Sequence, residues 1–178
     1  MNVRWVPFFL DPTIPPEGRY REPTTTPETP KSHLELRGEA SGILFRRGRK
    51  FTPNTHRALQ LQEYAYAHGL EGPAIDALHR QLFKAHFDEH TDISSVDVLT
   101  DIAGQHGMEH DDVRDALLTE RFKDDVDAGI AWSRAVGVTG IPTFIFNEKY
   151  AIVGAQEYPA FEQVMARLRE ETTGRGEG

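Results

Sequence analysis

The chain has 178 residues, of which 38% are hydrophobic and 27% are charged, a composition typical of a folded protein and not of a disordered one. Its formal net charge of −8 and the absence of a long basic run argue against nucleic acid or an anionic membrane surface as a partner. No apolar run approaches the ~20 residues of a membrane span, and no signal-peptide pattern opens the chain. We therefore expect a cytoplasmic protein that forms one domain over residues 1–178.

The first third of the chain predicts one strand followed by a long loop. Residues 3–10, VRWVPFFL, form a strand candidate, although Pro7 restricts it to an edge or a bulge. Residues 11–33 are rich in proline and threonine and lack periodicity, which predicts a mobile loop. A short helix or turn is expected over residues 34–39. The run RRGRK at residues 46–50 would suit an acidic partner, but in so acidic a chain a solvated turn is the ordinary interpretation.

The middle of the chain, residues 52–136, predicts four or five consecutive helices. Asn54 and its neighbours provide cap chemistry for the first helix, and Ser94 and Asp97 have the spacing of a capping box at a later one. Apolar residues recur at helical spacing between these signals. The positions expected in the core include Ala58, Leu61, Ala65, Ile75, Leu78, Leu82, Ala85, Leu99, Ile102, Val113, Leu117, Leu118, Val126 and Ile130.

Strand patterns return after Gly137. Residues 143–146 and 150–153 are short apolar runs separated by Asn147-Glu148-Lys149, which predicts an antiparallel hairpin. Pro159 suits the first turn of a final helix. The tail, residues 172–178, is expected to be disordered.

This order of elements resembles a thioredoxin-like domain with a helical insertion at residues 52–136. The segments VRWVPFFLDPTIPPEG, TPNTHRAL, KAHFDEHTDISSVDVLTDIA and GVTGIPTFIFNEKYAIVGAQ, at these spacings, resemble the DsbA-family oxidoreductases of the FrnE type. Relatives of that type include 2-hydroxychromene-2-carboxylate isomerases and kappa-class glutathione transferases. The resemblance covers residues 3–168, with a divergent stretch at 21–36, and it implies an α/β fold of the thioredoxin-like, DsbA type.

One part of the family pattern is not found in the chain. Relatives begin with a strand and a CPWC-like motif at the start of a helix, ahead of the strand that residues 3–10 resemble, whereas this chain contains no cysteine. We therefore expect a fold incomplete at its N-terminus, with no catalytic residue and no dithiol chemistry. Without the first strand, residues 143–146 would expose an unpaired edge. That strand is then expected to pair with residues 3–10, to pair across a homodimer, or to promote aggregation.

The resemblance points to Gly140, Ile141 and Pro142 as substrate-binding residues. In the family the proline of this loop is cis, and the backbone of the residue before it pairs with a bound peptide or with glutathione. From the residues alone, a trans proline that begins a strand is the ordinary interpretation. With the resemblance, we expect the Ile141–Pro142 bond to be cis. Asn54 lies where the family's PNT segment comes near the ligand, and a helix cap is an equally good role for it. The partner implied is a peptide or a thiol substrate protein, with glutathione as a further candidate.

Two histidine pairs have the i, i+4 spacing that can hold zinc from one helix face. They are His86 with His90 and His106 with His110; neither matches HExxH, and no third ligand is evident. We expect these histidines to be exposed helix residues, and we expect neither a metal site nor a cofactor.

Three hypotheses for the function remain open. The first is that the chain is a member of the DsbA-type thiol-disulfide oxidoreductase family that is inactive because it has no catalytic cysteine. Alternatively, it is a non-redox thioredoxin-fold protein that binds a peptide or partner, or a relative of the glutathione-dependent isomerases and transferases.

Overall fold

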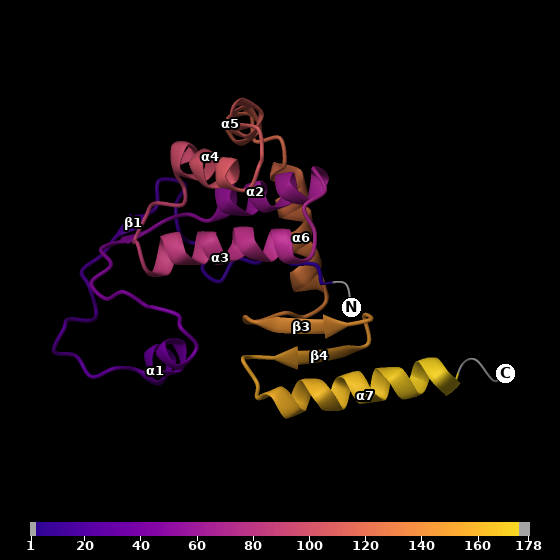
Figure 1. Ribbon diagram of the computed structural model, residues 1–178. Helices are drawn as coiled ribbons and strands as arrows, with labels where there is room; N and C mark the ends of the chain where they lie inside the picture. The colour runs from indigo at the N-terminus through magenta and orange to yellow at the C-terminus, as the bar shows by residue number, and fades with distance from the viewer. Residues whose placement is uncertain (1–2, 175–178) are drawn as a thin grey trace. The chain divides into compact units, whose positions relative to one another are not determined.

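The computed structural model describes residues 3–174, and the chain divides into two compact units, residues 1–131 and 132–178 (Figure 1). The first unit contains β1 (Arg19–Tyr20), α1 (His33–Ala40), β2 (Phe51–Thr52), α2 (His56–Ala67), α3 (Pro73–Phe87), α4 (Val96–Gln105) and α5 (His110–Leu118). The remaining elements are α6 (Lys123–Ala135), β3 (Thr143–Phe146), β4 (Tyr150–Val153) and α7 (Tyr158–Gly174). Among the described residues, no helix is long and apolar enough to cross a lipid bilayer.

The core of the first unit is formed by α2, α3, α4 and α5, which lie within the helical block predicted from the sequence. Helix α2 packs against the other three, α3 packs against α4, and α4 packs against α5 (Figure 1). Leu61, Leu78 and Leu99, one from each of α2, α3 and α4, are completely buried, and Val113 of α5 joins them. Truncation of one such leucine to alanine typically costs ~2–5 kcal/mol, so this cluster is the main source of stability of the unit.

A capping box explains where α1 begins, whereas the one predicted for a later helix is not formed. The Ser32 hydroxyl accepts from the Glu35 N–H at 3.2 Å and the Glu35 carboxylate accepts from the Ser32 N–H at 2.7 Å, a capping box that starts α1. The box predicted at Ser94 and Asp97 is wrong. Helix α4 begins at Val96, and the Ser94 hydroxyl donates instead to the Asp92 carboxylate at 2.6 Å.

The strand predicted over residues 3–10 is wrong. The segment pairs with neither of the two sheets of the described chain, β1–β2 and β3–β4, both antiparallel. Side chains of α2 satisfy its backbone instead: the Trp5 N–H donates to the Tyr66 hydroxyl at 2.9 Å, and Gln62 Nε2 donates to the Trp5 carbonyl at 3.1 Å. The predicted pairing of this segment with residues 143–146, which belong to the other unit, stays a prediction, and so does association through that strand.

The loop predicted over residues 11–33 contains β1. Its two residues pair with β2, Arg19 opposite Thr52 and Tyr20 opposite Phe51. The partner strand lies far along the chain, immediately before α2, so this small sheet connects the start of the helical block to the N-terminal segment.

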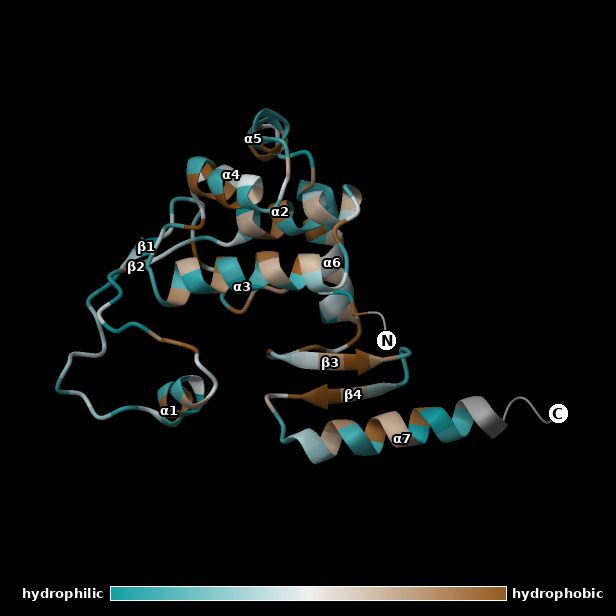
Figure 2. Cartoon of the chain, in the orientation of Figure 1, coloured by the Kyte–Doolittle hydropathy of each residue, from teal (hydrophilic) through white to brown (hydrophobic). Residues whose placement is uncertain are grey.

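The second unit is built on the predicted hairpin. β3 pairs with β4 from Thr143 opposite Val153 to Phe146 opposite Tyr150. Figure 2 shows apolar residues along both strands. Helix α7 packs against β4.

The face of α7 that meets the hairpin is aromatic. The Phe161 ring lies 4.9 Å from the Phe144 ring, edge to face. Helix α7 extends to Gly174, so the first three residues of the tail predicted to be disordered, 172–178, are helical, and residues 175–178 lie outside the described part of the chain.

Two glycine-to-alanine substitutions are expected to have opposite effects on stability. A Cβ on Gly129 of α6 would meet the Pro7 Cδ at 2.8 Å, whereas a Cβ on Gly104 of α4 has nothing within 4 Å. Gly104→Ala should raise the free energy of unfolding by ~0.5–1 kcal/mol through helix propensity. Gly129→Ala should lower it by ~1–3 kcal/mol through overpacking. Urea titrations followed by circular dichroism would measure both, and a stabilising Gly129→Ala would contradict the contact with Pro7.

The hairpin turn leads to a second stability prediction. Asn147 and Glu148 have positive φ angles of 48° and 55°, a conformation that asparagine tolerates and glutamate does not favour. Glu148→Gly should therefore stabilise the hairpin by ~1 kcal/mol. The control Glu162→Gly, within α7, should destabilise by ~1 kcal/mol because glycine is a poor helix former. If both variants are destabilised in a thermal melt, the left-handed turn is not formed in solution.

Candidate functional site

The loop predicted to bind substrate connects α6 to β3. Gly137, with a φ angle of 82°, turns the chain at the end of α6, and its N–H donates to the Arg134 carbonyl at 3.0 Å. The next N–H, of Val138, donates to the Ser133 carbonyl at 2.9 Å. Two such bonds around a left-handed residue close the last turn of a helix, which accounts for the glycine at position 137.

Hydrogen bonds hold this loop on both sides of Ile141. The Thr143 hydroxyl donates to the Gly140 carbonyl at 2.7 Å, and the Gly154 N–H donates to the Pro142 carbonyl at 2.8 Å. The Ile141–Pro142 peptide bond is cis. No residue in the described part of the chain forms a hydrogen bond with the Ile141 N–H or carbonyl, and Ile141 is 53% exposed. Ile141 therefore combines an unpaired backbone donor and acceptor with an exposed apolar side chain.

Asn54, the other predicted site residue, lies in the first unit, directly before α2. Its side-chain oxygen accepts from the His56 N–H at 2.9 Å, and its Nδ2 donates to the Ile14 carbonyl at 2.8 Å. The oxygen of this amide thus accepts from the first N–H of α2, and its nitrogen holds the loop before β1. The N-cap residue of the helix is Thr55, which makes no side-chain cap bond, so Asn54 supports the start of α2 from one residue further out. Its role in ligand binding stays a prediction.

The members of each histidine pair contact different partners. Within residues 3–174, no group of three histidine, aspartate or glutamate side chains is placed to hold a metal ion. The prediction of exposed helix residues is wrong for three of the four: His86, His90 and His106 are half-buried, and His90 and His106 lie outside the helices. Burial lowers the pKa of His86 to about 4. The contacts are Arg49 for His86, the Arg46 carbonyl for His90, Gln81 for His106 and Asp111 for His110.

His79 of α3 is a second histidine with a strongly shifted pKa. Burial lowers that pKa to about 4, so the ring is neutral at pH 7. Its Nε2 lies 3.0 Å from Gln62 Oε1, and because an amide oxygen only accepts, the ring proton is on Nε2. The Trp5 ring packs against it at 4.8 Å, edge to face. Held between Trp5 and Gln62 in one tautomer, His79 has a structural role.

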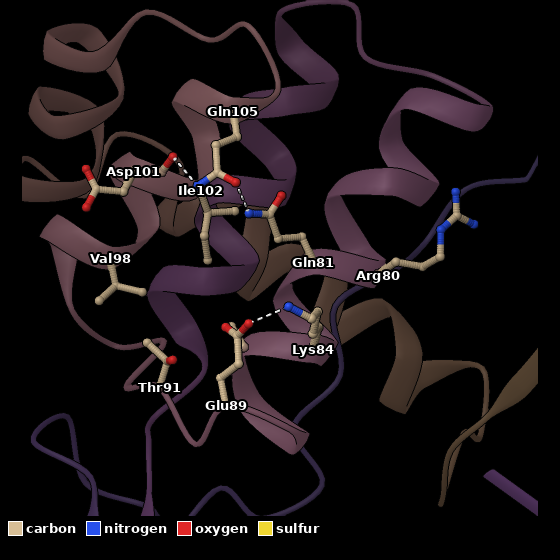
Figure 3. A pocket seen from close by; sticks show the side chains of 10 residues that line it. Arg80, Gln81, Lys84, Glu89, Thr91, Val98, Asp101, Ile102 and Gln105 are labelled. Carbon is tan, nitrogen blue, oxygen red and sulfur yellow. Dashed lines mark hydrogen bonds and ion pairs between the residues drawn. The ribbon is translucent and has the colours of Figure 1, made fainter. Parts of the chain in front are cut away.

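A cavity of about 620 Å³ lies between α3 and α4 (Figure 3). Four of its polar side chains bond to one another in pairs: Lys84 Nζ donates to Glu89 at 2.5 Å, and Gln81 Nε2 donates to Gln105 at 2.6 Å. Glu89 raises the pKa of Lys84, which keeps the amine protonated and unreactive as a nucleophile. The cavity has room for a ligand but no activated group, so it is a weaker candidate for chemistry than its size suggests.

Comparison with known proteins identifies a family and similar proteins in it. The model of the DSBA-like thioredoxin domain family matches residues 1–166. The protein YwbO of Bacillus subtilis (strain 168), which is named as uncharacterized, is 24% identical over 171 residues, covering 93% of this chain and 82% of that protein. The crystal structure of the probable DsbA oxidoreductase SCO1869 from Streptomyces coelicolor superposes with a TM-score of 0.66 at 25% identity. That match covers 78% of this chain and 58% of the other, so the chain spans less than two thirds of that protein's length.

The shifted pKa of His79 predicts an acid-sensitive fold. The folded chain keeps the ring neutral down to about pH 4, whereas the unfolded chain takes up a proton near the ordinary pKa of 6.5, so acid favours unfolding. The free energy of unfolding should fall as the pH decreases from about 6.5 to about 4, by on the order of 2 kcal/mol for this group.

A pH series of urea titrations would test this dependence. His79→Gln keeps a donor near Gln62 and removes the titration, so it should flatten the slope; part of the slope remains because burial also lowers the pKa of His86. The control His110→Gln, at an exposed histidine, shows how much of any change comes from a histidine-to-glutamine replacement outside the core. Identical slopes for wild type and His79→Gln would show that His79 does not stay neutral in the fold.

Proposed function

The chain belongs to the family of DSBA-like thioredoxin domains, and on that premise we propose that it binds an extended segment of a partner polypeptide at residues 140–143. In this proposal the 178 residues provide recognition but no thiol–disulfide exchange of their own. Within the family we assign the chain to the FrnE type, on the segments TPNTHRAL and GVTGIPTFIFN.

The observation that carries the proposal is the unpaired backbone of Ile141. The carbonyls on either side of it are engaged, that of Gly140 by Thr143 and that of Pro142 by Gly154. A peptide lying in an extended conformation beside Ile141 would supply the missing acceptor and donor, as in recognition by strand addition. The exposed isoleucine side chain adds an apolar contact to these two hydrogen bonds.

The absence of cysteine separates recognition from exchange. Thiol–disulfide exchange proceeds by attack of a thiolate on a disulfide, and these 178 residues contain no thiol. The name of the solved relative describes that protein as a probable DsbA oxidoreductase, and this chain covers 58% of its length. We therefore propose that this chain binds a partner polypeptide, and we do not assign to it the oxidoreductase activity that the relative's name describes.

Peptide binding can be tested with two matched variants of the second unit. Ile141 and Val153 are β-branched residues of similar exposure, 53% and 57%. The probe is a fluorescent insulin B chain whose cysteines have been carboxamidomethylated, so that no disulfide can form. Ile141→Asp should weaken binding at least tenfold, about 1.4 kcal/mol, whereas Val153→Asp should change it by less than twofold.

Two further measurements separate the three functional hypotheses. In an insulin reduction assay with dithiothreitol as the electron donor, the protein should leave the rate at its uncatalysed value, and an acceleration by mass-verified protein would overturn the proposal that it lacks exchange activity. Displacement of the labelled peptide by millimolar glutathione would favour the glutathione-dependent class instead. Equal losses in Ile141→Asp and Val153→Asp would remove residues 140–143 as the binding site.

A further inference from the structure

A second cleft, of about 370 Å³, lies in the first unit and is lined by arginines. Residues 21–35 form one part of its wall and residues 45–49 another, and Phe87 and His90 complete it near the end of α3. Arg21, Arg46, Arg47 and Arg49 bring positive charge to it, and Thr24 and Thr25 bring hydroxyl groups. A concentration of four arginines is unusual in a chain whose net charge is −8, so each needs an account of its partner.

Two of the four arginines are neutralised by carboxylates. Arg47 donates to Glu35 from Nε at 2.6 Å and from Nη2 at 3.1 Å, a two-pronged pair, and it also donates to backbone carbonyls of the 11–33 loop. Arg46 donates from Nη2 to Asp88 Oδ1 at 2.9 Å. Arg46 and Arg47 therefore line the cleft, but their charges are balanced by these two carboxylates.

The other two arginines, Arg21 and Arg49, have no carboxylate partner among the described residues. Arg49 is half-buried, with its guanidinium 5.9 Å from the centre of the Phe87 ring. Burial lowers the pKa of Arg49, and the charge of the neighbouring Arg21 lowers it further. Arg21 is exposed, and its charge repels the half-buried guanidinium of Arg49. An anion bound between the two would relieve this repulsion.

His86 positions Arg49 for such a contact. Burial lowers the pKa of His86 to about 4, so its ring is neutral and Nε2 is free to accept from Arg49 Nη1. One nitrogen of the guanidinium is thus anchored on the protein side, while no described residue bonds to Nε or Nη2. These two nitrogens form the fork that recognises carboxylate and phosphate groups.

We propose that this cleft binds a small ligand with two negative charges on oxygen atoms, a phosphate monoester or a dicarboxylate, with a phosphate or carboxylate group between Arg21 and Arg49. The hydroxyls of Thr24 and Thr25, which have no partner within the described residues, complete the set of donors. The volume suits a small molecule.

NMR titration of the full chain tests the proposal. Inorganic phosphate and succinate are added to isotope-labelled protein, with sodium chloride at matched ionic strength as the reference. Saturable shifts should concentrate on the amides of Gly48 and Arg49, and the tighter of the two ligands identifies the anion class. Arg21→Gln and Arg49→Gln should each raise the dissociation constant at least tenfold. The control Arg114→Gln removes the same charge from an exposed pair with Asp97 and should change it by less than twofold.

Three results would overturn the proposal. One is the absence of saturable shifts with either anion beyond those caused by sodium chloride. Another is an equal loss of affinity in Arg114→Gln and in the cleft variants, which would indicate a general charge effect. Thermal melts establish that each variant is folded; if Arg49→Gln does not fold, the wild-type titration decides alone, and shifts spread over scattered surface residues instead of residues 48–49 count against the site.

Discussion

The burial of residues 60–65 in helix α2 is the constraint on which the architecture of residues 3–131 depends. Gln60, Gln62 and Glu63 are no more than 6% exposed, although each carries polar atoms that lose water on burial. An unpaired amide or carboxylate in such a place costs more than a hydrogen bond contributes. Gln60 bonds to His56 of its own helix, whereas Gln62 and Glu63 have partners from outside it. Arg4 donates to Glu63 at 2.7 Å, and the Trp5 carbonyl accepts from Gln62. The N-terminal segment is thereby ordered by the polar needs of a helix and not by a neighbouring strand.

The ordering of the N-terminal segment by helix side chains explains which parts of the fold can be predicted from the sequence. The thioredoxin-like α/β class of the DsbA type is confirmed by the family match and the solved relative, and the helices and the hairpin lie where their periodicity predicts them. Leu118 is an exception: it continues the apolar pattern but ends α5 and is 58% exposed. Residues 3–10 have a pattern that suits an extended chain, and a local pattern does not tell whether a strand or a helix side chain meets its backbone. The pairing of β1 with β2 was missed for the same reason, because it joins distant segments.

The site residues show the same division between local and distant information. The bond of Asn54 to the start of α2 is local, and such a bond can be predicted from the sequence. The loop around Ile141 is also visible in the sequence, but only the family resemblance marks it as a site. The cleft at Arg49 is not predicted from the sequence. The run RRGRK suggests a solvated turn, but Arg46 and Arg47 are paired with Asp88 and Glu35. The positive charge of Arg49 stays unpaired, and Arg21 from another segment adds a second one. The residues of this cleft come from three segments of the chain, and none of the three segments has a sequence pattern that indicates it.

Recognition and exchange make different physical demands, and the function that we propose requires only the first of them from this chain. Exchange needs a thiolate whose pKa is lowered by its surroundings, and no arrangement of backbone replaces it. Recognition at Ile141 needs a free N–H, a free carbonyl and a loop held still on both sides, all of which depend on Gly137, Thr143 and Gly154. None of these groups depends on a cysteine for its place, because their bonds are to backbone within residues 132–154. A chain of this family can therefore keep the loop around Ile141 formed without a cysteine of its own.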